Sequence, residues 1–386
     1  MKLRLKPTIL PYRMDREVVL HVSGQYARIP DPHGAIWELT HALDGEHTTA
    51  ELTDFICKQY PETDRAQIES VIGELIRHRM VEIPEEELTT SLREDLRIRF
   101  SRNLDFFGSL IPFGDNKYIY QERLQAARIC VLGCGGLGTH ILFDLAAVGV
   151  KHLTILDFDR IELSNLNRQI LYKESDIGLE KVDTAKRRLL EFNSGLEIRT
   201  HHRRLDSTES VGEVVQGHDL VICIADKPAN YMAEWLNAAC ATRGIPFVTG
   251  GVDVRRAVMY SVQPGASGCV SCWMECAFKA SSVDQFVISK NKRDDITHAR
   301  PLPAFVPLVA VTAGIMVSEA IKFITRCQPP GLTNKLKEFS FDDLEIGVAE
   351  RWERIPNCRV CGIEGAAIPG GNTRAQEEGT TQTGLL

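Results

Sequence analysis

A glycine-rich turn between two apolar runs carries the most distinctive chemistry in the sequence. The run 129–132 ends at Gly133-Cys-Gly-Gly-Leu-Gly138, a helix-like segment follows over 139–149, and a second apolar run occupies 153–156. Glycines at such a turn let backbone N–H groups approach a phosphate and let the helix pack closely on the preceding strand. The order strand, turn, helix, strand therefore predicts a nucleotide site at Gly133, Gly135, Gly136 and Gly138.

Two acidic residues follow the second apolar run. Asp157 lies about twenty residues beyond the glycines, where a carboxylate can accept hydrogen bonds from ribose hydroxyls, and Asp159 stands beside it. The glycines alone do not distinguish NAD, FAD, S-adenosylmethionine or ATP, and a tight turn without a ligand is the plainer alternative. Asp157 favours the nucleotide.

Composition limits the class of protein. A chain of 386 residues with 44% hydrophobic and 25% charged residues predicts a globular protein of two or three domains. The net charge of -7 gives no electrostatic reason to expect binding to nucleic acid. The apolar segment 304–325 contains Pro307, Glu319 and Lys322, which favour a buried helix over a membrane span. We therefore expect a cytoplasmic protein that neither spans nor binds a membrane.

Residues 1–88 are predicted to form a separate winged-helix domain. Alternation around Ser23-Gly24 predicts a hairpin. Three helical patterns follow: one ends at Gly45 as a C-cap, one opens with a Thr48–Glu51 capping box, and one covers 68–76. These helices carry at least as many acidic as basic residues, which disfavours DNA binding.

The pattern Leu43-Asp-Gly45 followed by Thr49-Ala-Glu-Leu52 resembles the PqqD-like precursor-recognition domain of enzymes that modify ribosomally made peptides. The resemblance implies that residues 1–88 bind a leader peptide as an added strand against the hairpin, in a groove shared with the third helix. An inert dimerisation or stabilising domain is the alternative.

Ordered motifs over residues 97–362 resemble the E1-like adenylating superfamily of ThiF, MoeB and the ubiquitin-activating enzymes. The motifs besides the glycine turn are Arg99-Phe-Ser-Arg102, Asp157-Phe-Asp-Arg-Ile-Glu-Leu-Ser-Asn-Leu-Asn-Arg-Gln169, Asp176-Ile-Gly-Leu-Glu-Lys-Val182, and Asp219-Leu-Val-Ile-Cys-Ile-Ala-Asp226, where Ala225 replaces the family's Thr. The resemblance implies an α/β fold, with a Rossmann-like adenylation domain and a mainly parallel sheet over 89–362.

The resemblance also implies transfer of AMP from ATP to a carboxylate. Negative charge grows on the α-phosphate and the departing pyrophosphate, so cations and a metal must be aimed there. By resemblance, Lys181 and Arg168 contact the phosphates, Asn165 helps to hold them, and Asp226 holds Mg²⁺.

The remaining nucleotide contacts implied by the resemblance come from two places. Asp157 binds the ribose, with Asp159 next to it in the cofactor site. Arg102 reaches the γ-phosphate from the other subunit of a homodimer, because its planar fork suits phosphate oxygens.

Two Cys-x-x-Cys pairs predict a metal site. Four thiolates suit tetrahedral Zn²⁺ with no open position, which is a structural arrangement. The gap between the pairs is far wider than in a zinc ribbon, but it is similar to the family's split four-cysteine site. The predicted ligands are Cys269, Cys272, Cys358 and Cys361. Cys276 is interpreted as neither a metal ligand nor an acceptor thiol.

Two polar segments complete the chain. Segment 277–300 matches in position the crossover loop that covers the substrate in this family, and its Lys290, Lys292 and Arg293 suit an acidic peptide; a solvated loop is the alternative. The tail 363–386 is rich in glycine and threonine and is predicted to be disordered.

These features predict a homodimeric enzyme that uses ATP and Mg²⁺ to adenylate a carboxylate of a ribosomal precursor peptide during peptide-antibiotic biosynthesis. The architecture most resembles the MccB and PaaA type of the superfamily. Dehydrative cyclisation of acidic side chains is the favoured outcome, because the basic loop suits an acidic core peptide. Three alternatives stay open: microcin C-like AMP transfer to a peptide C-terminus, MoeB-like or ThiF-like adenylation of a ubiquitin-like sulfur carrier, and a non-catalytic E1-like scaffold.

Overall fold

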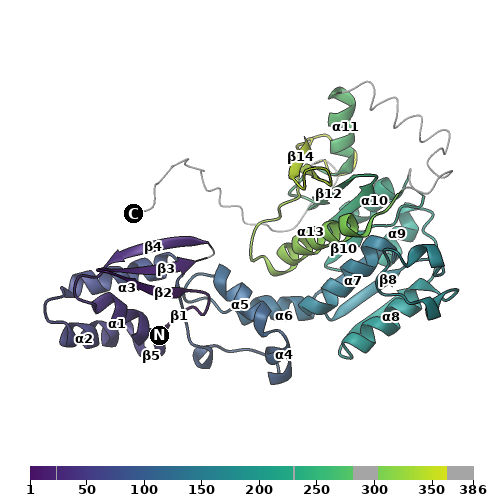
Figure 1. Cartoon of the computed structure of the whole chain (residues 1–386). Coiled ribbons are helices and arrows are strands. Elements are labelled where there is room, and N and C mark those ends of the chain that lie inside the picture. The colour runs from purple at the N-terminus through teal and green to yellow at the C-terminus, as the bar shows by residue number, and fades with distance from the viewer. Residues whose placement is uncertain (23, 229–230, 281–302, 363–386) are drawn as a thin grey trace. The chain divides into compact units, whose positions relative to one another are not determined.

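The computed structural model describes residues 1–22, 24–228, 231–280 and 303–362, which fall into two compact units (Figure 1). Unit 1 spans Met1–Glu122 and unit 2 spans Arg123–Gly370. Most of the predicted crossover loop and the whole predicted tail lie outside the described residues. Residues 277–280 are described and form the end of helix α11 (Val270–Ala280).

Unit 1 begins with two small antiparallel sheets and three helices. One sheet has the order β2-β3-β4 and the other β5-β1-β6. The strands are β1 (Lys2–Leu5), β2 (Leu10–Met14), β3 (Glu17–Val22), β4 (Gln25–Pro30), β5 (Asp44–Thr48) and β6 (Val81–Glu82), and the helices are α1 (Ala35–Ala42), α2 (Thr49–Gln59) and α3 (Arg65–Arg77). Their apolar faces share one core, in which Leu20, Leu39 and Ile56 are fully buried.

The predicted hairpin and the three predicted helices are all present in unit 1. The capping box is confirmed, since the hydroxyl of Thr48 accepts from the N–H of Glu51 and the N–H of Thr48 donates to Oε2 of Glu51 at 2.8 Å. The predicted C-cap at Gly45 is wrong. Helix α1 ends at Ala42, and Gly45 lies in strand β5 with a φ of 99°, where an added Cβ would stand 2.9 Å from Cγ of Pro84.

After η1 (Glu85–Glu87), the compact unit continues beyond residue 88 through α4 (Glu94–Arg99), α5 (Ser101–Leu110) and the start of α6 (Tyr118–Ala126). Polar contacts join the residues that flank α5 and α6 to the residue after β1 and to η1. The Lys6 ammonium donates to the carbonyl of Ile111 at 2.9 Å, and Glu85 accepts from Lys117 at 2.7 Å. The assignment of peptide recognition to residues 1–88 stays a prediction.

Unit 2 is built on an eight-stranded sheet of order β14-β13-β12-β11-β10-β7-β8-β9. The parallel strands are β7 (Arg128–Leu132), β8 (His152–Leu156), β9 (Glu197–His201), β10 (Leu220–Cys223) and β11 (Phe247–Asp253), and the antiparallel strands are β12 (Arg256–Val262), β13 (Lys335–Ser340) and β14 (Ile346–Arg351). Strand β10 is buried at every position, as expected for a parallel strand covered on both faces. The predicted Rossmann-like α/β fold is confirmed.

The helices of unit 2 include one that resembles a membrane span. They are α7 (Gly136–Val148), α8 (Lys181–Phe192), α9 (Thr208–Val215), α10 (Met232–Arg243), α11 and α13 (Val306–Thr325), with short turns η2 (Leu163–Asn165) and η3 (Glu174–Asp176). Helix α13 is long and apolar enough to cross a membrane, yet it packs along α7 and against β11 and β12. Glu319 on α13 is buried and accepts from the Ser261 hydroxyl at 2.8 Å and from the N–H of Gly331. Such contacts identify α13 as a core helix of unit 2.

Candidate functional site

The glycine turn joins β7 to α7 with no room for side chains at two positions. Gly133 has a φ of 108°, in the left-handed region, and a Cβ there would stand 2.9 Å from Cδ1 of Ile224. A Cβ on Gly138 would overlap the carbonyl oxygen of Gly133. Helix α7 therefore starts directly against the end of β7. Its first-turn N–H groups lack intrahelical acceptors, which makes this end of the helix suited to an anion.

Asp157 holds the turn from the end of β8. Its carboxylate accepts from the N–H of Cys134 at 2.6 Å and from the N–H of Asp159 at 2.8 Å, and the residue is 8% exposed. A carboxylate has roughly four acceptor positions, so two stay available for ribose hydroxyls. The residue thus shapes the turn as well as offering a place for a sugar.

Lys181 and Asp159 form an ion pair beside the turn. The ammonium lies 3.0 Å from Oδ2 of Asp159, and the lysine side chain is 6% exposed. Tyr172, for which the sequence predicts no role, links this pair to the turn. Its hydroxyl donates to the carbonyl of Cys134 at 3.0 Å and lies 3.4 Å from the carbonyl of Lys181. Burial raises the pKa of Tyr172, which keeps the hydroxyl a donor.

Arg168 lies over the turn, whereas Asn165 shapes the loop before it. A Cβ on Gly136 would stand 3.3 Å from Cγ and Cδ of Arg168, whose guanidinium donates to Oδ1 of Asn167 at 2.9 Å. The buried Asn165 accepts from the N–H of Glu162 at 3.2 Å through its amide oxygen. The structure therefore brings Arg168 to the turn, and it shows Asn165 as a loop-capping residue.

Asp226 follows the strand next to the turn. A Cβ on Gly133 would stand 3.1 Å from the backbone nitrogen of Ala225, so the chain passes the turn immediately before Asp226. Asp226 is exposed and has no ion pair among the described residues. A free carboxylate, two cations and the unpaired N–H groups of α7 fit a nucleotide triphosphate with Mg²⁺.

Arg102 lies in unit 1, on α5 (Ser101–Leu110), whereas the glycine turn belongs to unit 2. Its side chain is 94% exposed, and its contact with Asp105 is long, at 3.7 Å. The role of Arg102 in trans stays a prediction.

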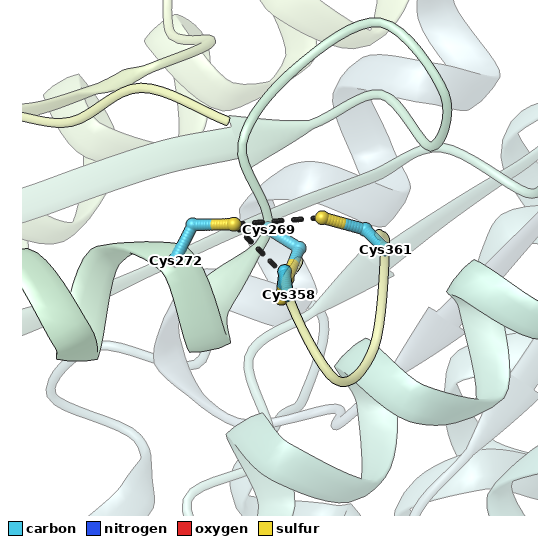
Figure 2. A group of neighbouring side chains, drawn as sticks. All are labelled: Cys269, Cys272, Cys358 and Cys361. Atoms are coloured by element: carbon cyan, nitrogen blue, oxygen red, sulfur yellow. Dashed lines mark hydrogen bonds between the residues drawn. The ribbon is translucent and has the colours of Figure 1, made fainter. Parts of the chain in front are cut away.

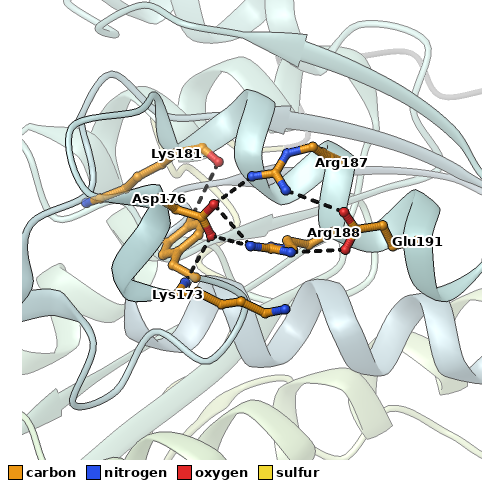
Figure 3. A network of polar contacts seen from close by, with 7 residues as sticks. Lys173, Asp176, Lys181, Arg187, Arg188 and Glu191 are labelled. Atoms are coloured by element: carbon orange, nitrogen blue, oxygen red, sulfur yellow. Dashed lines mark hydrogen bonds and ion pairs between the residues drawn. The ribbon is translucent and has the colours of Figure 1, made fainter.

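An ion-pair network fixes the loop that leads to Lys181. Figure 3 shows the guanidinium groups of Arg187 and Arg188 between Asp176 on one side and Glu191 on the other. Asp176 accepts at 2.7 Å from Arg187 and at 2.8 Å from Arg188, and its side chain is 3% exposed. Burial disfavours its charge, but hydrogen bonds from both arginines and from the N–H of Lys173 lower its pKa overall. The network anchors the loop one turn before α8.

We expect Asp176→Asn to lower the free energy of unfolding at pH 7 by about 3 kcal/mol, because two guanidinium groups lose their shared buried partner. The lowered folded-state pKa means that this stability is complete above the unfolded-state pKa of about 3.9 and is lost as pH falls through the folded-state value. Urea unfolding at pH 7 and pH 3 measures both effects. The matched control Asp183→Asn removes an exposed carboxylate, and equal midpoints for the two variants would contradict the prediction.

The four predicted cysteine ligands converge in unit 2. Figure 2 shows Cys269 and Cys272, at the start of α11, facing Cys358 and Cys361 of the loop after β14. All four are buried, and their sulfurs lie within 4.8 Å of one another. Neighbouring sulfurs are 3.5 to 3.9 Å apart, close to the roughly 3.8 Å edge of a tetrahedron with Zn–S bonds of about 2.3 Å. The cluster could hold a zinc ion.

One thiol of the cluster ionises more readily than an ordinary cysteine thiol. Burial opposes ionisation of Cys358, but hydrogen bonds from the N–H groups of Cys361 and Val360 lower its pKa to about 7. Metals take the thiolate, so these backbone donors assist binding.

Comparison with protein families and curated relatives gives a consistent result. The ThiF family model matches residues 101–360. A sulfur carrier protein adenylyltransferase of Thermus thermophilus is 32% identical over 252 residues, which cover 63% of this chain and 85% of that protein. A molybdopterin-synthase adenylyltransferase of Escherichia coli is 29% identical over 246 residues, which cover 63% and 90%. A MOCS3 adenylyltransferase and sulfurtransferase of Culex quinquefasciatus is 42% identical over 130 residues, and the chain spans 29% of its length.

Solved structures extend the likeness to most of the chain. The structure of E. coli MccB with ATP has a TM-score of 0.76 at 24% identity and covers 94% of this chain and 100% of that one. MccB in complex with N-formylated MccA gives the same TM-score, identity and coverage. PaaA has a TM-score of 0.67 at 22% identity and covers 90% of this chain and 100% of its own. At these identities the likeness shows a shared fold, and its extent means that the fold includes most of the N-terminal residues.

Proposed function

The chain belongs to the ThiF family, within the E1-like adenylyltransferase superfamily, and on this basis we propose that it transfers AMP from ATP to a carboxylate. The observation that supports the proposal is that Arg168 and the residue before Asp226 lie against the glycine turn at the N-terminus of α7. Lys181 is linked to the same turn through Tyr172. Asp226 would hold Mg²⁺, which neutralises charge on the phosphates. Lys181 and Arg168 would bind the phosphates, and Asp157 and Asp159 would line the ribose side.

The proposed substrate is a ribosomal precursor peptide, modified in the cytoplasm during the biosynthesis of a peptide antibiotic. MccB has been solved in complex with MccA, and its structure covers 94% of this chain, including most of residues 1–88. In the described part of unit 1, strand β4 pairs with β3 and leaves its other edge open, so a leader peptide could add there as a strand. We propose dehydrative cyclisation as the outcome.

Adenylation of a sulfur carrier is the second candidate. The Thermus relative, a sulfur carrier protein adenylyltransferase, supports this alternative through its 32% identity. However, its match leaves more than a third of this chain uncovered. The part of this chain that the relative does not match favours a peptide substrate over a carrier protein.

Incubation with ATP, Mg²⁺ and the short peptides encoded beside the gene, followed by mass spectrometry, tests the proposal. Loss of water from a peptide supports cyclisation, whereas gain of a nucleotidyl group supports the microcin C-like outcome. Recovery of a small carrier protein as the sole adenylated species would contradict the peptide assignment.

We also propose a homodimer in which Arg102 completes the partner's site. Ile98, on α4, and Phe106, one helical turn after Arg102 on α5, are 69% and 56% exposed. Leu163 and Ile170, on the loop around Arg168, are 67% and 52% exposed. Two exposed apolar patches, each beside a cation proposed to bind phosphate, suit a reciprocal interface.

Arg102→Ala should therefore lower AMP formation by about 10²- to 10³-fold, because the γ-phosphate loses a bidentate donor. Mixing this variant with Asp226→Asn, with subunit exchange, should restore about a quarter of wild-type activity, because half of the dimers contain one intact site. Activity no higher than the sum of the two variants would place Arg102 in its own subunit's site. Arg97→Ala, an exposed arginine on α4, is the control.

A further inference from the structure

Gln169 carries a buried amide with no described partner for its oxygen. The residue is 2% exposed, and its Oε1 is buried without a hydrogen-bond partner among the described residues. Its backbone is satisfied, since the N–H donates to Asn165 at 3.0 Å and the carbonyl accepts from Tyr172 at 3.3 Å. A buried, unsatisfied amide oxygen costs free energy, so a contact made by Nε2 of the same amide with a ligand is a physical reason for keeping this side chain.

The amide lies at the glycine turn. A Cβ on Gly135 would stand 3.9 Å from Nε2 of Gln169, and no other heavy atom outside the neighbouring residues comes within 4 Å of that point. Arg168 occupies the equivalent place over Gly136. The amide of Gln169 and the aliphatic part of the Arg168 side chain therefore lie over two successive glycines, at the N-terminus of α7.

We propose that Gln169 is a further catalytic residue, which donates from Nε2 to a non-bridging oxygen of the α-phosphate while Oε1 accepts from a bound water. This inference rests on the proposed adenylation. In that step a carboxylate oxygen attacks the α-phosphorus, the bond to the β-phosphate oxygen breaks, and its electron pair leaves with pyrophosphate. No proton is transferred. The non-bridging oxygens carry more charge in the transition state, and a donor preorganised over Gly135 stabilises that charge.

The substitution Gln169→Met tests this role, because it keeps the length of the side chain and removes both polar atoms. Gln125→Met is the matched control, since the Gln125 amide donates to Gly149 at 2.6 Å in the same unit. Without nucleotide, we expect the Tm of Gln169→Met to equal or exceed that of the wild type, and the Tm of Gln125→Met to fall. ATP affinity should fall about fivefold in Gln169→Met, and AMP formation at saturating ATP about a hundredfold.

Two results would overturn the inference. One is a wild-type rate of AMP formation by Gln169→Met. The other is a fall in the Tm of nucleotide-free Gln169→Met as large as the fall in Gln125→Met. Such a fall would show that the Gln169 amide stabilises the fold. If the wild-type protein makes no AMP with any peptide, the proposed function fails separately. Calorimetric titration with ATP then tests the amide. Equal ATP affinities of the wild type and Gln169→Met would contradict the contact between Nε2 of Gln169 and the α-phosphate.

Discussion

Asp226→Asn is expected to abolish AMP formation, with a loss of at least about 10³-fold, while leader-peptide binding persists. The substitution keeps the shape of the side chain and removes the charge that would hold Mg²⁺. Asp226 is exposed and has no ion pair among the described residues, so the fold does not depend on its charge. Chromatographic measurement of AMP and fluorescence anisotropy of a labelled leader peptide separate the two activities.

Asp253→Asn is the matched control for this variant. Asp253 ends β11 at the same edge of the sheet and pairs with Arg256 at 3.5 Å. We expect its AMP formation to stay close to wild type. If Asp226→Asn keeps its activity, Asp226 does not hold the metal. If Asp226→Asn loses leader binding, the proposal that the N-terminal domain alone binds the leader is contradicted.

Replacing Cys358 and Cys361 together by Ser is expected to remove bound zinc and to lower Tm by on the order of 10 °C. Two ligands cannot close a tetrahedral site, and the sulfur cluster joins α11 to the loop after β14. Trp352 reports this change, because it is 3% exposed and its indole donates to the carbonyl of Gly268, next to Cys269. Its emission should shift to the red as water enters.

Metal analysis and tryptophan emission measure this prediction. Cys327→Ser changes a half-buried cysteine of the same unit outside the cluster, and it should keep about one zinc per chain. Treatment of wild-type protein with a strong chelator should reproduce the emission shift. Full zinc occupancy in the double variant would show that the metal lies elsewhere.

If the chain binds ATP at the turn as proposed, Lys181 and Arg168 would exchange their present partners for the phosphates. Lys181 is paired with Asp159, and Arg168 donates to Asn167, so neither cation points freely into solution. A triphosphate offers both cations a stronger acceptor than the groups they contact here. Release of Lys181 would also free the Asp159 carboxylate at the edge of the site.

The parts of the fold that follow from local rules were predictable. The glycine turn, the capping box at Thr48 and the cysteine pairs each depend on residues close in sequence, and the order of the motifs gave the sheet. Strands β1 and β5 were not predicted, because both are short and each contains two charged residues. Their pairing depends on contacts distant in sequence.

The sequence predicted which residues belong to the candidate site, but it did not predict the contacts between them. Family motifs indicated Asp157, Arg168 and Lys181, but not that Asp157 would accept from Cys134 or that Lys181 would pair with Asp159. These contacts depend on loop backbone and side-chain rotamers, which spacing does not determine. Tyr172 and the Gln169 amide left no separate signal, because a tyrosine or glutamine in a loop is ordinarily a solvated residue.

The most direct test of the central claim uses ATP, Mg²⁺ and the accepted peptide labelled with ¹⁸O in its carboxylates. Attack of a carboxylate oxygen on the α-phosphorus, followed by cyclisation, predicts AMP that carries one ¹⁸O atom, with pyrophosphate released in equal amount. ADP with ¹⁸O in inorganic phosphate would show attack at the γ-phosphorus and would contradict adenylation by this site.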